Sequence, residues 1–185
     1  MRMRSFILLA LISLLSFLHP FTASAQTQVP SAPSATPSVD YVLPYPGILP
    51  DHPLFFLKRV RDKILILLTR DQIKKSQIFL LLADKHLVMG QLLWEKNKFE
   101  LGSSTLKQGE NYLLQSVLTL DDENIKNNIQ ADMDKIELAS KKHEEVLDKL
   151  TENTTDGTIL QALNEAVGIT NQARQKILSL KSKTS

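Results

Sequence analysis

Apolar residues after Pro53 recur at alternating three- and four-residue spacings, and no segment alternates between polar and apolar positions. This pattern is typical of amphipathic helices that pack on one another. It predicts an all-α fold, a bundle of four to five helices. The expected helices cover about residues 53–68, a segment from an Asp71 cap to about 96, about 99–120, a segment from an Asp121 cap to about 152, and a last helix that follows residues 153–157.

The same spacing indicates which face of each helix is buried. In the first helix the apolar positions are expected to face the bundle, and the basic residues between them to lie on the solvated side. The expected inward positions are Leu54, Leu57, Val60, Ile64, Leu67 and Leu68, and the expected solvated ones are Lys58, Arg59, Arg61 and Lys63. The last two helices carry near-heptad apolar seams, which predicts an antiparallel hairpin.

All eight prolines lie at or before Pro53, so the chain divides sharply into an extended part and a helical domain, residues 54–182. Residues 26–39 read as a flexible linker rich in Pro, Ser, Ala and Thr. Residues 40–53 are richer in apolar residues and predict a proline-rich strap. This strap either lies rigidly along the bundle or presents its side chains to a partner. The interaction candidates are Tyr41, Tyr45, Pro46, Pro50 and Phe55.

Residues 1–25 have the pattern of a signal peptide. Arg2 and Arg4 precede an apolar run, Pro20 breaks it, and Ala23-Ser24-Ala25 fits a cleavage site. We therefore expect an exported protein, periplasmic, extracellular or at the cell surface, with no membrane span once the signal is cleaved. If the signal is kept, it anchors the domain to a membrane through the linker.

Removing the signal leaves 20 basic residues (22 minus 2) against 20 acidic ones, so the remaining chain is formally neutral. A neutral domain lacks the basic field that drives nucleic-acid binding. The chain also contains no cysteine, which excludes disulfides, thiolate metal sites and a thiol nucleophile. Its stability must therefore come from packing.

No pattern in the sequence announces a reaction or a cofactor. The glycines are scattered singly, and the histidines fit neither the zinc-protease signature nor the di-iron helical motif. We therefore assign no catalytic and no cofactor-binding residue. His86 and His143 lie on or near apolar helix faces, with Asp84, Glu144 and Glu145 nearby as further ligands of a metal ion. The alternative is a histidine packed at a helix seam and hydrogen-bonded to a neighbour.

Three segments resemble the domain of unknown function 5667 family. They are LPYPGILPDHPLFFLKRVRD in the strap and first helix, LLLADKHL at residues 80–87, and SKKHEEVL at residues 140–147. The resemblance covers about residues 41–180. It implies an exported or membrane-tethered helical bacterial protein without an established activity. His86 stands where the family often carries arginine, whereas His143 fits the family pattern and is therefore the better metal or ligand candidate.

These observations predict a non-enzymatic extracytoplasmic interaction or structural module, with an envelope or surface protein as the partner. The alternative is a metal or small-ligand sensor, or a chaperone-like helical protein, that binds near His143. The sequence leaves the oligomeric state, the partner and the retention of the signal segment open.

Overall fold

The computed structural model describes residues 38–122, 125 and 129–184. The described residues form an all-α structure, as predicted, with five helices and no strand. The helices are α2 (Phe55–Leu68), α3 (Gln72–Glu95), α4 (Phe99–Leu120), α5 (Gln130–Glu152) and α6 (Gly157–Thr184). The predicted signal peptide and the predicted linker up to residue 37 lie outside the described residues.

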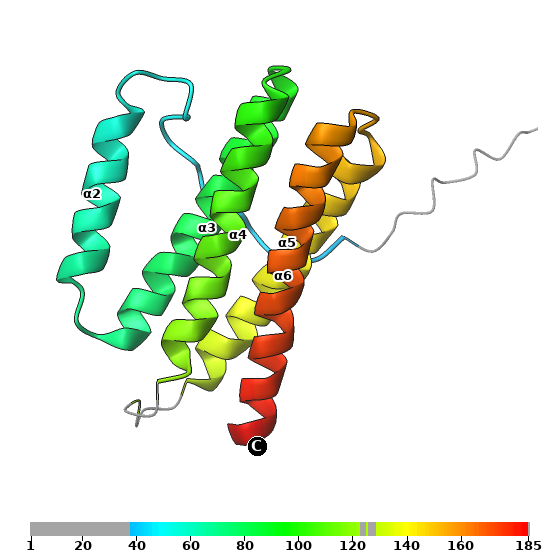
Figure 1. The fold of residues 1–185 in the computed structure, drawn as a ribbon. Coiled ribbons are helices and arrows are strands. Elements are labelled where there is room, and N and C mark those ends of the chain that lie inside the picture. The colour runs from blue at the N-terminus through cyan, green and yellow to red at the C-terminus, as the bar shows by residue number, and fades with distance from the viewer. Residues whose placement is uncertain (1–37, 123–124, 126–128, 185) are drawn as a thin grey trace, which may run out of the picture. The chain divides into compact units, whose positions relative to one another are not determined.

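Helices α3 to α6 form an up-down-up-down bundle, in which successive helices are antiparallel (Figure 1). Helix α4 packs between α3 and α6, and α6 also packs against α5, so the predicted hairpin of the last two helices is confirmed. At the start of α3 the Asp71 carboxylate accepts a hydrogen bond from the Lys74 amide at 2.9 Å. After α3, Asn97 has a φ of 58°, the left-handed conformation that reverses the chain into α4.

The bundle core consists of two apolar clusters, one toward each end. The cluster nearer the C-terminus contains Leu80, Ala83, Leu113, Val117, Leu120, Met133, Ile136, Ala139, Ala173, Ile177 and Leu180. The other contains Leu87, Leu106, Val146, Leu147, Ile159, Leu163 and Ala166. The two sets are separated by about one turn in α3 and by about two turns in α4, α5 and α6, so a layer of the bundle interior remains between them.

Small residues bring α3 and α4 close together. A Cβ atom added at Gly90 would lie 2.4 Å from the Cγ atom of Leu106. One added at Gly109 would lie 3.0 Å from the Cβ atom of His86 and 3.2 Å from the carbonyl oxygen of Ala83. These glycines are therefore used for close packing of the two helices.

The predicted start of the fourth helix at Asp121 is wrong, because α5 begins at Gln130. Asp121 instead follows the last residue of α4, as its C-cap, and its carboxylate lies 2.5 Å from Lys176 Nζ of α6. The ion pair holds the end of α4 against α6. Ile125 and Ile129 precede α5 and still pack against the core cluster nearer the C-terminus.

The strap, residues 40–53, runs along the bundle before the chain enters α2 (Figure 1). Just before it, the Val39 amide donates to Glu145 Oε2 of α5 at 2.9 Å. At its far end Asp51 pairs with Lys96 and Lys98, which flank the turn between α3 and α4, at 3.2 and 2.9 Å. The Lys58 ammonium of α2 donates to the Pro46 carbonyl at 2.7 Å. These contacts support the first of the two alternatives, a strap fastened along the bundle.

The predicted orientation of α2 is wrong, because its apolar side faces away from the bundle. The six positions expected inside are 42–80% exposed, and they are Leu54, Leu57, Val60, Ile64, Leu67 and Leu68. Lys58, expected on the solvated side, instead faces the bundle and binds the strap, while Asp62 is buried. Lys58 and Asp62 therefore face the rest of the domain, whereas Arg59, Arg61 and Lys63 are exposed, as predicted.

Candidate functional site

A polar layer fills the space between the two apolar core clusters. Each bundle helix contributes one buried side chain to it: Asp84 from α3, Glu110 from α4, His143 from α5 and Thr170 from α6. Each of them stands at a buried position of its helix where the neighbouring positions on the same face are mostly apolar. Because burying unpaired polar groups is costly, the layer must satisfy its own hydrogen bonds.

The His143 ring is held between two carboxylates. Its Nδ1–H donates to both oxygens of Glu110, at 2.9 and 3.0 Å, and its Nε2–H donates to Asp84 Oδ1 at 3.1 Å. His143 and Glu110 are completely buried. Both ring nitrogens therefore act as donors, which requires the imidazolium form of the ring.

Two hydroxyl groups complete the layer. The Thr170 hydroxyl donates to Glu110 Oε2 at 2.8 Å. The Tyr41 hydroxyl, from the strap, donates to Asp84 Oδ2 at 2.7 Å. No buried side-chain polar atom in the described part of the chain lacks a hydrogen-bond partner. The layer is thus a closed network of five residues.

The two carboxylates keep His143 charged. Burial by itself would lower its pKa, but the negative charge of Glu110 and the hydrogen bonds to Asp84 and Glu110 raise the pKa to about 9. Burial and the adjacent Asp84 carboxylate raise the pKa of Tyr41 as well, so its phenol stays protonated. At neutral pH the layer therefore carries a buried cation with carboxylates on both sides.

This arrangement favours a structural role over a metal site at His143. An imidazolium with both N–H groups engaged offers no lone pair to a metal ion or to a substrate proton. Among the described residues, no group of three His, Asp or Glu side chains is arranged to hold a metal ion. The geometry matches the alternative interpretation from the sequence, a histidine packed at a seam.

The sequence places Asp84 near the two histidines as a further metal ligand, but it does not predict Glu110 or Thr170 as site residues. Glu144 and Glu145, which it also named, point to other partners: Glu144 pairs with Arg174 of α6, and Glu145 with Lys149 at 2.5 Å. One signal for Glu110 was present in the sequence. It lies on the apolar seam of α4 at four residues from Leu106 and three from Leu113, where an acid requires a buried partner.

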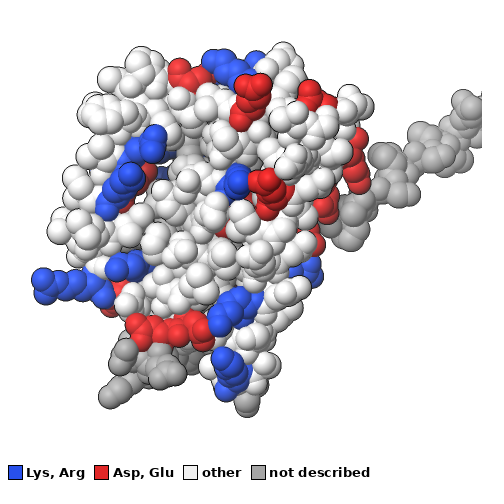
Figure 2. Space-filling model, in the orientation of Figure 1, with Lys and Arg blue, Asp and Glu red and all other residues white. Residues whose placement is uncertain are grey.

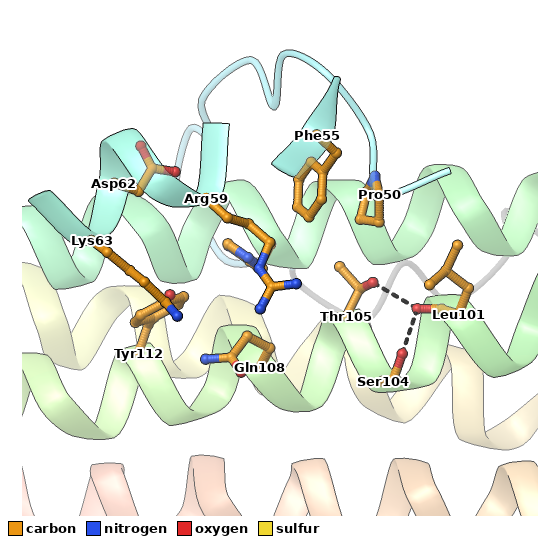
Figure 3. A pocket seen from close by; sticks show the side chains of 11 residues that line it. Pro50, Phe55, Arg59, Asp62, Lys63, Leu101, Ser104, Thr105, Gln108 and Tyr112 are labelled. Carbon is orange, nitrogen blue, oxygen red and sulfur yellow. Dashed lines mark hydrogen bonds between the residues drawn. The ribbon is translucent and has the colours of Figure 1, made fainter. Parts of the chain in front are cut away.

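A second feature is a cavity of about 430 Å³ between α2 and α4. Pro50 and Phe55 lie at one end of it, and Arg59 and Lys63 extend from α2 toward α4 (Figure 3). His86 of α3 also lines the cavity and lies edge-on to the Tyr112 ring, with ring centroids 5.1 Å apart. The cavity therefore joins charged, aromatic and apolar side chains.

His86 is separate from the polar layer. Its Nδ1–H donates to the Leu82 carbonyl at 2.8 Å. Burial lowers the pKa of His86 to about 4, so the ring is neutral at pH 7 and its Nε2 is an acceptor. The two histidines proposed as metal candidates thus lie in different environments, one charged and enclosed, the other neutral beside a cavity.

The interaction candidates divide between the inside and the outside of the domain. Tyr41 is bound to Asp84 and Pro46 is buried. Pro50 and Phe55 are partly buried in the cavity wall. Tyr45 is 84% exposed and lies beside Leu54 in a groove at the edge of α2. Of the five residues, Tyr45 is therefore the one that the fold leaves free for a partner.

In a comparison with protein-family models, residues 47–157 match a Domain of unknown function (DUF5667). The chain belongs to this family. The family match spans the second half of the strap, α2 to α5 and the start of α6, and includes Asp84, Glu110 and His143. No match to the chain was found among curated proteins or among solved structures.

Proposed function

We propose that this protein is a non-enzymatic module of the bacterial envelope that attaches to an anionic membrane surface through the outer face of α2. The observation that carries the proposal is the orientation of α2, whose apolar side faces outward. An apolar face of this size is normally covered by another surface in the functional state.

The outer face of α2 is continuous and nearly free of polar groups. Its members, which we call the outer apolar face, are Leu54, Phe56, Leu57, Val60, Ile64, Leu67 and Leu68. Tyr45 and Ile48 of the strap line a groove with Leu54 and Leu57, so they extend this face. Burying one such side chain fully contributes about 1.5–3 kcal/mol, so a few insertions give measurable binding.

The charges of α2 favour a lipid surface over an apolar protein surface. The helix has four basic residues and one acid, a net charge of +3 (4 minus 1). Lys58 is bound to the strap and Asp62 is buried, whereas Arg59, Arg61 and Lys63 are exposed. Basic residues beside an outward apolar face are the arrangement of helices that lie in the membrane interface. Figure 2 shows the surface over α2 as mostly uncharged, with lysine and arginine side chains beside it.

The predicted export signal supports this location, since an exported chain passes through a membrane and, if the signal is kept, stays at it. In the part of the chain that the structure describes, no helix is both long and apolar enough to cross a bilayer. Attachment through α2 is therefore interfacial. The enclosed polar layer, which offers no group to a substrate, supports the non-enzymatic part of the proposal.

Vesicle co-sedimentation tests this function. The protein recovered after export is mixed with vesicles of phosphatidylcholine and phosphatidylglycerol, or of phosphatidylcholine alone, at about 100 mM salt. We expect tighter binding to the anionic vesicles. The double variant Leu57→Ser/Ile64→Ser is expected to bind at least about tenfold more weakly, a loss of about 1.4 kcal/mol that corresponds to part of two apolar side chains.

The matched control is Leu118→Ser/Leu178→Ser, which removes two exposed leucines from α4 and α6. Equal loss in both double variants would contradict the proposal, as would absence of binding to the anionic vesicles. A concentration-dependent dimer that Leu57→Ser/Ile64→Ser dissociates, without vesicle binding, would assign the outer apolar face to a second copy instead.

A further inference from the structure

We propose that the cavity between α2 and α4 binds a small organic anion, whose carboxylate or phosphate group pairs with Arg59 and Lys63. The cavity lies on the side of α2 that faces α4, and Lys63 stands at the border between this side and the outer apolar face, three residues from Val60 and four from Leu67. Binding of a soluble anion in the cavity does not require membrane attachment, so the two proposals can be tested separately.

The two cations are placed for a ligand. Both side chains line the cavity and extend from α2 toward α4 (Figure 3). Neither has an ion-pair or hydrogen-bond partner among the described residues, whereas Lys58 binds strap carbonyls and Arg61 binds Asp62. Two neighbouring cations without a counterion form a site for an anion, and guanidinium in particular matches carboxylate and phosphate oxygens.

The one acid among the lining residues does not neutralise them. Asp62 is 6% exposed, and its Oδ1 accepts from Arg61 Nε at 3.0 Å and from Arg61 Nη2 at 2.7 Å. Arg61 thus holds one oxygen of this carboxylate, and Figure 3 shows the Asp62 side chain turned away from the ends of Arg59 and Lys63. The positive charge of Arg59 and Lys63 remains directed into the cavity.

The other residues that line the cavity indicate which kind of anion would fit. Gln108 and Tyr112 from α4 provide polar groups near the cations, and His86 adds a neutral ring at the wall. Pro50, Phe55 and Leu101 form an apolar end (Figure 3). A cavity of about 430 Å³ lies within the usual size range of small-molecule sites. The expected ligand is therefore a molecule with one anionic end and an aromatic or aliphatic body.

Calorimetric titration of the exported protein at pH 7 tests the site with three probes: phenyl phosphate, inorganic phosphate and benzyl alcohol. We expect phenyl phosphate to bind more tightly than either of the others, because only it combines the anion with an apolar body. The variant Arg59→Gln/Lys63→Gln is expected to lose at least about tenfold in phenyl phosphate affinity, since each lost charge-assisted contact weakens binding.

The control Arg70→Gln/Lys74→Gln makes the same change in net charge at two exposed positions outside the cavity, and should bind like the unmodified protein. Gln108→Glu provides a second test, because it adds a negative charge to the cavity wall and should weaken the anion without removing a cation. Gln115→Glu, at an exposed position of the same helix, is its control.

Absence of saturable phenyl phosphate binding at about 10 mM, or equal losses in the cavity and control variants, would overturn the proposal. A lipid headgroup carries the same chemistry as the probe, and the vesicle assay separates the two sources. If Arg59→Gln/Lys63→Gln reduces vesicle binding while no soluble anion binds, the two cations serve the membrane surface and the cavity is not a site. Soluble binding without vesicle binding supports the cavity and contradicts only the membrane proposal.

Discussion

The Tyr41 hydroxyl donates a hydrogen bond to Asp84 Oδ2 at 2.7 Å, and the other oxygen of the same carboxylate accepts from His143. The strap and the core of the bundle thus share one carboxylate. Because that carboxylate is nearly fully buried, the position of the strap is coupled to the charge state of the polar layer. This relationship makes the strap part of the folded core and not an accessory segment.

Replacing Tyr41 by Phe should therefore destabilise the domain. The change removes one hydrogen bond to a buried carboxylate and leaves that oxygen unsatisfied, a cost of about 1–3 kcal/mol. Urea unfolding followed by circular dichroism measures the difference in the free energy of unfolding. Tyr45→Phe is the matched control, because Tyr45 is exposed and its change should be neutral. Equal stabilities of the two variants would mean that the strap does not contribute through Asp84.

The charge of His143, and not only its shape, should stabilise the bundle. His143→Leu leaves Glu110 and Asp84 buried without their cation, and breaking a buried pair in this way costs about 3–5 kcal/mol. Adding Glu110→Gln and Asp84→Asn to His143→Leu removes the buried negative charges and should recover part of that loss. Chemical unfolding of the two variants gives the comparison. A triple variant less stable than His143→Leu would show that the carboxylates are stabilising without the imidazolium.

The sequence predicted the helices of the bundle well, because three-and-four spacing and local caps such as Asp71 are properties of neighbouring residues. It did not predict the partner of His143, because Glu110 is 33 residues away and is brought close only by packing of α4 on α5. The prediction of the orientation of α2 was wrong for a related reason. Periodicity locates an apolar arc on a helix, but whether that arc faces the bundle depends on what the polar side binds, here the strap carbonyls.

Stability should decrease as the pH rises above neutrality. The pKa of His143 in the folded protein, about 9, lies above the ordinary value of 6.5, so the folded state binds the proton more tightly than the unfolded state. This contribution is fully present below about pH 6.5 and is lost as the pH rises through about 9. Urea unfolding between pH 6 and 9.5 should show a loss on the order of a few kcal/mol.

The same series on His143→Leu identifies the titrating group. The pKa of Tyr41 is also raised, but the ordinary value of 10.0 means that its contribution to stability changes only above the measured range of pH 6 to 9.5. Hydrogen bonds from Lys141 and Lys181 lower the pKa of Glu137 to about 2, and a hydrogen bond from Lys149 lowers the pKa of Glu145 to about 2. These two groups therefore change the stability only at acid pH. The pH dependence should therefore flatten in His143→Leu. If stability falls with rising pH just as steeply in this variant, the pH dependence belongs to another group.

The close approach of α3 and α4 predicts opposite outcomes for two glycine substitutions. Gly109→Ala places a methyl group 3.0 Å from the Cβ atom of His86 and 3.2 Å from the Ala83 carbonyl, both on the facing helix. Since neither atom is the flexible end of a side chain, the helices must separate, at a cost of about 1–3 kcal/mol. Gly168→Ala, in the interior of α6, meets no atom within 4 Å and should stabilise the domain by about 0.4–1 kcal/mol. Thermal unfolding of both variants measures the contrast. If Gly109→Ala were as stable as Gly168→Ala, the tight packing of α3 on α4 would not contribute to stability, and the two helices would have room to adjust.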